Sequence, residues 1–249
     1  MYNAYRWLEV ERIQKVIANR GYCSRRKAEE LLKQNKIKVN GQLVTELGRL
    51  VNDSDVIEIE GNILGREEKE YILLYKPRGV ITSTSDDKHR KTVLDIVNTK
   101  KRLYPVGRLD YDTSGILLLT NDGSLTNKLI HPKNKIEKMY IAKVKGFASK
   151  ESLIKLSKGV IIDNYKTAPA KAKLKKYDKK TNTSIVELTI HEGKNHQVKK
   201  MFNALGFDVL KLKRETFSFL NLSGLTSGEY RYLTPKEVKI LYNEVNKKS

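Results

Sequence analysis

The chain has 249 residues, of which 39% are hydrophobic and 31% are charged, a composition typical of a folded globular protein. A single cysteine excludes an intramolecular disulfide, and no apolar run approaches the roughly 20 residues of a membrane helix. The sequence begins without the apolar segment of a secretory signal, so we expect a cytoplasmic protein. The net charge of +20 indicates a polyanionic partner. Nucleic acid is the first candidate for this partner, and an acidic membrane surface is the second. The alternative is that the basic composition has no functional meaning.

The first predicted elements are two short helices followed by a β-hairpin. Apolar residues recur at helical spacing in residues 13–17, and Gly21 is placed to end this helix. Ser24 is a candidate N-cap for the second helix. The pair Asn40-Gly41 then predicts a tight hairpin turn. These elements form a small unit of their own.

The second predicted helix begins with three cations, Arg25, Arg26 and Lys27. Cations at a helix N-terminus oppose the helix dipole. A phosphate bound at that end would explain them, because free backbone N–H groups also point there. Residues 11–41 as a whole hold nine Lys and Arg against three Asp and Glu. We therefore predict that these three residues bind substrate phosphates, and an ordinary solvated face is the alternative.

A polar segment separates this unit from the rest of the chain. The sequence NILGREEKE is short, charged and contains glycine, as linkers do. We predict an N-terminal tail at residues 1–10, a small domain at 11–62, a linker at 63–69 and a larger domain at 70–249.

Strand and helix patterns alternate through the larger predicted domain. Buried or alternating strands are predicted in YILLYKP, ILLLT, KMYIAKVKG and SIVELTIHEG. Helices are predicted in SKESLIKLSKG, in NHQVKKMFNALG and from Pro235, where Thr234 and Glu237 have capping-box spacing. This order predicts an α+β fold with a mixed, mainly antiparallel sheet.

Polar or charged groups adjoin apolar runs at three places in this domain. Asp110 lies in a loop before the buried run Ile116–Thr120, and Tyr140 lies within an alternating strand. Asn195 is a candidate helix cap, and Lys199 flanks the apolar face of that helix. Taken singly, they are an ordinary turn residue, a core aromatic, a cap and a surface lysine. The sequence contains no P-loop and no GxGxxG, and its four histidines lack metal-ligand spacing.

Taken together, three motifs resemble those of the RsuA/RluB branch of the RNA pseudouridine synthases, in the same order: GRLDYDTSGILLLTNDG, KMYIAKV and GKNHQVKKMFNALG. The segments SRRKAEELL and KVNG resemble the S4 RNA-binding domain that these enzymes carry. The resemblance covers nearly all of residues 11–245. It implies an S4 domain joined to a pseudouridine synthase domain.

The resemblance also implies roles for individual residues. Asp110 matches the essential catalytic aspartate, and Tyr140 matches the tyrosine that stacks on the target base. Lys199 matches the basic residue that pairs with the aspartate. Some branches have an arginine there, which can bind a carboxylate through two parallel hydrogen bonds, as a lysine cannot. Arg108 matches an arginine that holds the strand of the extruded base. The start of the third motif adds three expected substrate-binding residues: Asn195, His196 and Gln197.

The activity implied by the resemblance is isomerisation of a uridine to pseudouridine in rRNA, with no cofactor and no metal. The motifs are most similar to those of RluB-type enzymes, which act on 23S rRNA, and an RsuA-type enzyme acting on 16S rRNA is the first alternative. A non-catalytic, ribosome-associated S4 protein is the second. We expect a monomer that binds RNA and neither DNA nor a membrane.

Overall fold

The computed structural model describes residues 10–246, which separate into two compact units. The division falls between Lys69 and Glu70, except that Lys100–Arg102 group with the first unit. The predicted N-terminal tail falls largely on residues 1–9, which lie outside the described residues. Within the described part of the chain, no helix is both long and apolar enough to cross a membrane.

The first unit packs two helices against short strands. Its elements are β1 (Glu11–Arg12), α1 (Ile13–Asn19), α2 (Arg25–Lys33), β2 (Ile37–Val39), β3 (Gln42–Leu43), β4 (Leu50–Val51), β5 (Ile57–Ile59) and β6 (Asn62–Ile63). Four strands form a sheet in the order β3-β2-β5-β6, and β1 pairs with β4. The buried core includes Ile13, Ile17, Ala28, Leu31, Leu32, Ile37, Ile57 and Ile59.

Local signals in the sequence set the ends of these elements. The Ser24 hydroxyl accepts a hydrogen bond from the Lys27 amide at 3.1 Å, which confirms the predicted N-cap of α2. Gly21 follows the end of α1 with φ +85°, a conformation that glycine adopts without strain. Asn40 and Gly41 both have positive φ in the β2–β3 turn, as the predicted hairpin requires.

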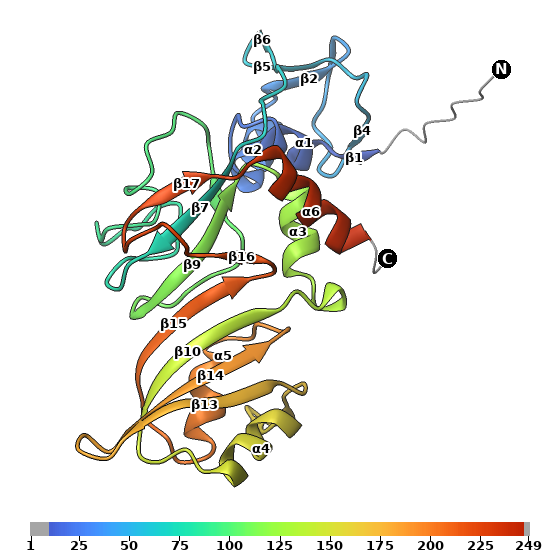
Figure 1. Cartoon of the computed structure of the whole chain (residues 1–249). Helices are drawn as coiled ribbons and strands as arrows, with labels where there is room; N and C mark the ends of the chain where they lie inside the picture. The colour runs from blue at the N-terminus through green and yellow to red at the C-terminus, as the bar shows by residue number, and fades with distance from the viewer. Residues whose placement is uncertain (1–9, 247–249) are drawn as a thin grey trace, which may run out of the picture. The chain divides into compact units, whose positions relative to one another are not determined.

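The second unit is built on one large sheet, whose strands can be followed in Figure 1 from β17 and β7 to β13. Its strands follow the order β13-β14-β10-β15-β9-β7-β17, and β15 and β9 pair in parallel. The main strands are β7 (Tyr71–Lys76), β9 (Thr113–Thr120), β10 (Lys138–Lys145), β13 (Lys171–Asp178), β14 (Thr183–Ile190), β15 (Val209–Phe217) and β17 (Tyr230–Tyr232). Short strands are β8 (Tyr104–Pro105), β11 (Ile161–Ile162), β12 (Tyr165–Lys166) and β16 (Leu220–Asn221). The predicted α+β fold with a mainly antiparallel sheet is confirmed.

Helices cover both faces of the central strands. They are α3 (Gly123–Ile130), α4 (Lys150–Lys158), α5 (Gln197–Asn203) and α6 (Pro235–Asn246), with a 3₁₀ turn at Pro132–Asn134. Leu117 and Leu119 of β9 belong to the core that includes α4 and α5, whereas Ile116 and Leu118 belong to the core beneath α3 and α6. Because both faces are buried, β9 is an uninterrupted apolar run instead of an alternating one.

Three of these helices match the predictions, and one does not appear in them. Thr234 and Glu237 form the predicted capping box of α6, with the Thr234 amide donating to Glu237 Oε2 at 2.8 Å. Helix α4 lies where it was predicted, capped by Ser149. Helix α3 was missed, although Asp122 is a clear cap whose carboxylate accepts from the Leu125 amide at 3.0 Å.

Candidate active site

A cavity of about 240 Å³ opens in the second unit where the loop before β9, the strands β10 and β15, and the loop before α5 meet. All of the residues that line it belong to this unit. The three sequence motifs contribute to it together, through Arg108, Asp110, Tyr140, His196, Gln197 and Lys199. Motif residues as far as 91 positions apart in the chain therefore meet in one cavity, since Arg108 and Lys199 both line it.

Asp110 contacts two basic side chains of the third motif. Lys199 Nζ lies 3.0 Å from Asp110 Oδ2, and His196 Nε2 lies 3.4 Å from Asp110 Oδ1. The same ammonium donates to Asp112 Oδ1 at 2.5 Å. Burial lowers the pKa of Lys199, but its hydrogen bonds with Asp112 and Asp110 outweigh burial and raise the pKa overall. Lys199 thus remains a cation that stabilises both carboxylates.

A buried lysine holds the loop that carries Asp110. Lys76, at the end of β7, is fully buried, and its Nζ donates to the carbonyl oxygens of Pro77, Asp110 and Thr113 at 2.9, 3.1 and 2.9 Å. Burial lowers the pKa of Lys76 to about 8 against the opposing effect of the nearby aspartates. Thr82 adds a second brace, since its hydroxyl donates to the Leu109 carbonyl at 2.6 Å. The aspartate is therefore fixed by contacts to its main chain.

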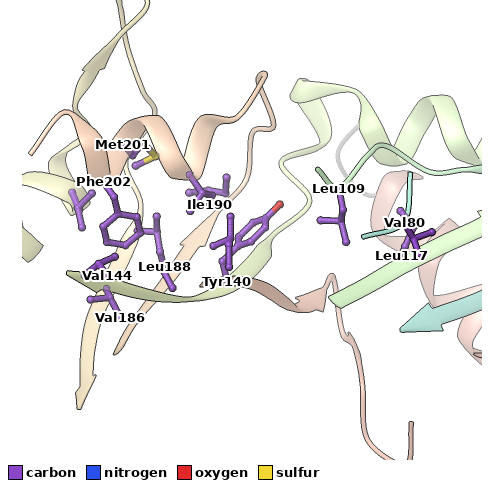
Figure 2. Close-up of a cluster of buried hydrophobic side chains, with 14 of the residues drawn as sticks. Val80, Leu109, Leu117, Tyr140, Val144, Val186, Leu188, Ile190, Met201 and Phe202 are labelled. Carbon is purple, nitrogen blue, oxygen red and sulfur yellow. The ribbon is translucent and has the colours of Figure 1, made fainter. Parts of the chain in front are cut away.

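Tyr140 joins the cavity to the hydrophobic core. Its side chain is only 8% exposed and packs in the core cluster with Leu188 and Ile190 of β14. In Figure 2 its hydroxyl points away from Leu188 toward the side on which Leu109 lies. The ring is thus rigidly held with one part facing the cavity, a geometry suited to stacking on a planar ligand.

The start of the third motif differs from the sequence prediction. Asn195 is exposed and does not cap α5, which begins at Gln197 after His196 turns the chain with φ +52°. The predicted cap is therefore wrong, because a turn closed by the Gln197 amide on the Lys194 carbonyl delays the helix. Gln197 is buried and holds this loop, accepting from the Lys194 amide at 2.9 Å and donating to Glu192 at 2.5 Å.

The remaining predicted residues are exposed. Arg108 lies at the edge of the cavity with its side chain in solvent. Arg25, Arg26 and Lys27 belong to the first unit, and the Lys27 ammonium pairs with Glu30 at 2.9 Å. Among residues 10–246, no carboxylate lies within 4 Å of Arg25 or Arg26 in an ion pair. These two arginines are the cations that remain available at the start of α2.

Sequence reasoning missed several residues that shape the cavity. Lys76 and Asp112, which contact the Asp110 loop and Lys199, were not predicted as site residues, and neither were Lys138 and Arg214, which line the cavity. The signal for Arg214 was present, because strand alternation places it on the same face as the buried Leu212. Within residues 10–246, no group of three or more His, Cys, Asp or Glu side chains is arranged to hold a metal ion.

Comparison with known proteins gives consistent results for both units. Residues 70–204 match the family model described as RNA pseudouridylate synthase, and residues 11–57 match the S4 domain. The chain is 61% identical over 233 residues to ribosomal large subunit pseudouridine synthase B of Bacillus subtilis, covering 93% of this chain and 96% of that protein. It is 35% identical to the dual-specificity RNA pseudouridine synthase RluF of Escherichia coli, and the match covers 96% of this chain and 80% of that protein. A crystal structure of a pseudouridylate synthase matches with a TM-score of 0.67 at 32% identity, covering 93% of this chain and 99% of that one.

Proposed function

Because this chain belongs to the RNA pseudouridine synthases, we propose that it converts one specific uridine of large-subunit rRNA into pseudouridine. The enzyme is an isomerase, since the product has the same atoms as the substrate. Similarity over nearly the whole chain to a large-subunit enzyme supports this choice of RNA. We further propose that it acts as a monomer in the cytoplasm, on the RNA of the ribosome.

The proposed reaction breaks the C1′–N1 bond, rotates the uracil and joins C1′ to C5. The proton leaves C5 and N1 gains one, so no external oxidant or reductant takes part. The target base must leave its stack, which costs a few kcal/mol. We assign Tyr140 to stack on the extruded base, an interaction of about 1–3 kcal/mol. Asp110 is assigned as the carboxylate that acts on the nucleoside, and Arg108 as a contact to the RNA strand at the cavity edge.

The observation that carries this proposal is the Asp110–Lys199 pair inside the cavity. The Lys199 ammonium lies 3.0 Å from Asp110 Oδ2 and forms an ion pair with this carboxylate. The main-chain contacts of Lys76 hold the loop that carries this carboxylate. A carboxylate held in an ion pair, in a cavity that a flat aromatic side chain also lines, suits attack on a flipped nucleoside.

The test is in vitro modification of unmodified 16S and 23S rRNA by the wild-type protein and by Asp110→Asn. Pseudouridines are mapped as carbodiimide adducts that stop reverse transcription. We expect one stop in 23S rRNA that depends on Asp110, with RNA affinity retained in the variant because its shape is nearly unchanged.

Each other outcome has a definite meaning. A stop in 16S rRNA would replace the large-subunit assignment with the small-subunit one. A stop that persists with Asp110→Asn would overturn the role of this carboxylate. Binding without a stop in either RNA would favour a non-catalytic S4 protein.

A further inference from the structure

Two cations on the strands that line the cavity have no part in the chemistry described above. Lys138 lies on β10 and Arg214 on β15, and both line the cavity. Arg214 is paired in register with Tyr140 on the neighbouring strand, so the two side chains lie side by side on one face. Arg214 is 3% exposed. A charge this deeply buried calls for a partner.

The structure provides acceptors for only some of the hydrogen-bond donors of Arg214. Arg214 Nε donates to the Ile116 carbonyl at 2.9 Å, but Nη2 is buried without a hydrogen-bond partner among residues 10–246. Lys138 Nζ donates to the Ile136 carbonyl at 3.0 Å. Within the described chain, neither side chain has a carboxylate within 4 Å in an ion pair. Nη2 of the buried guanidinium therefore remains unsatisfied, and the Lys138 ammonium has one hydrogen-bond acceptor among the described residues.

The main chain fixes the position of the arginine. Gly115 of β9 is paired with Arg214 and has φ +120°. A Cβ at this glycine would lie 2.2 Å from the Arg214 carbonyl oxygen, so any other residue would push β15 away. Together with the Nε hydrogen bond, this close approach holds the guanidinium in place before any ligand arrives.

The charges around this pair favour an anion. Burial, and then the charge of Arg214, lower the pKa of Lys138 to about 8, while Glu192 opposes them. Glu192 is already occupied, because its Oε1 accepts from the Ala168 amide and from Gln197. The charged residues that line the cavity are five cations and two carboxylates: Arg108, Lys138, Lys194, Lys199, Arg214, Asp110 and Glu192.

We infer that Lys138 and Arg214 form a subsite that binds the phosphodiester group of the extruded uridine, next to the ring of Tyr140. A neutral uracil carbonyl could accept a hydrogen bond from Arg214, but it would leave the repulsion between the two cations in place. A phosphate removes that repulsion and fits the paired donors of a guanidinium edge. This inference rests on the proposed function, since it names the part of that substrate which the subsite holds.

The first test measures binding without turnover. Uridine 3′,5′-bisphosphate and uridine are titrated against the full-length wild type, Arg214→Gln and Lys211→Gln, with NMR line broadening of the ligand as the readout. Lys211 lies on the same strand, is exposed and does not line the cavity, so its variant is the matched control. We expect Arg214→Gln to weaken bisphosphate binding about tenfold or more and to leave uridine binding unchanged.

Equal weakening for uridine and its bisphosphate would mean that Arg214 contacts the base, and this would overturn the inference. The inference would also be overturned if the wild type bound the bisphosphate no better than uridine. If Arg214→Gln loses its folded circular-dichroism spectrum, Lys138→Gln is compared in its place with the same expected outcomes.

The second test separates this inference from the proposed function. Stem-loop RNA containing the mapped uridine is made with one neutral methylphosphonate linkage, either 5′ or 3′ to that uridine. We expect one of these linkages to lower kcat/KM of the wild type and of Lys211→Gln about tenfold, with little further effect on Arg214→Gln. Equal sensitivity in all three proteins would overturn the subsite. Absence of turnover on unmodified RNA would instead contradict the proposed function, and the bisphosphate titration would still decide the subsite.

Discussion

The cavity and the start of α2 both present basic residues, but the two regions hold them in opposite ways. In the cavity, Lys199 bridges two aspartates, and behind the Asp110 loop the buried Lys76 donates to three carbonyl groups. At the start of α2, Arg25 and Arg26 are exposed. Held charges can set the geometry of a reaction, whereas solvated charges contribute affinity through release of counterions. The two regions should therefore respond differently to substitution.

The largest difference is expected for Lys199. Lys199→Met removes the cation 3.0 Å from Asp110, and we expect kcat to fall roughly 10²–10³-fold with little change in RNA affinity. Single-turnover kinetics at saturating RNA measure this effect. Lys200→Met is the matched control, because Lys200 is the next residue and pairs with Asp163 away from the cavity lining. A similar loss in both variants would show that the helix, and not the ion pair, is responsible.

The next effect concerns the brace beneath the aspartate loop. Lys76→Met leaves the carbonyl oxygens of Pro77, Asp110 and Thr113 without their donor, so we expect the free energy of unfolding to fall by about 2–4 kcal/mol. Urea denaturation measures this change, and Lys145→Met, an exposed residue of β10, serves as the control. An unchanged urea midpoint would mean that water replaces the ammonium and that the brace is unimportant.

This brace also shows where sequence reasoning ends. Asp110, Tyr140 and Lys199 could be predicted because each lies in a motif that resembles those of a known family. Lys76 could not be predicted, because two of its three carbonyl partners lie 34 and 37 residues further along the chain. A lysine at the end of a strand is usually solvated, and only the tertiary fold shows that this one is buried.

The helices show the same distinction between local and non-local causes. The caps of α2 and α6 were predicted because Ser24 and Thr234 act on residues three positions away. The start of α5 was predicted wrongly, because Gln197 is engaged by Glu192 and the turn before it displaces the cap. The missed subsite residue Arg214 lies in a strand whose alternation marks it as inward-facing, so this signal was available in the sequence.

A smaller effect is expected at the start of α2. Arg25→Gln and Arg26→Gln each remove one cation, so we expect Kd for RNA to rise roughly threefold to tenfold. The slope of log affinity against log salt should fall by about 1 for each, while kcat at saturating RNA stays unchanged. Lys33→Gln, at the other end of the same helix, is the control. A loss of kcat with constant Kd would mean that these arginines act in the reaction itself.

The smallest expected effect is the pH dependence of Asp112. The hydrogen bond from Lys199 holds the pKa of Asp112 below its ordinary value of 3.8. A carboxylate whose folded pKa is lowered stabilises the fold above its unfolded pKa and loses this contribution as pH falls through the folded one. Asp112→Asn should therefore reduce the free energy of unfolding by about 0.5–1 kcal/mol at pH 7, since the carboxylate is half exposed. Urea denaturation at pH 7, 5 and 3 should show the difference from wild type shrinking toward pH 3. If the difference between wild type and Asp112→Asn is unchanged at pH 3, Asp112 acts through packing. The Lys199–Asp112 ion pair would then contribute as little to stability as the solvated arginines of α2.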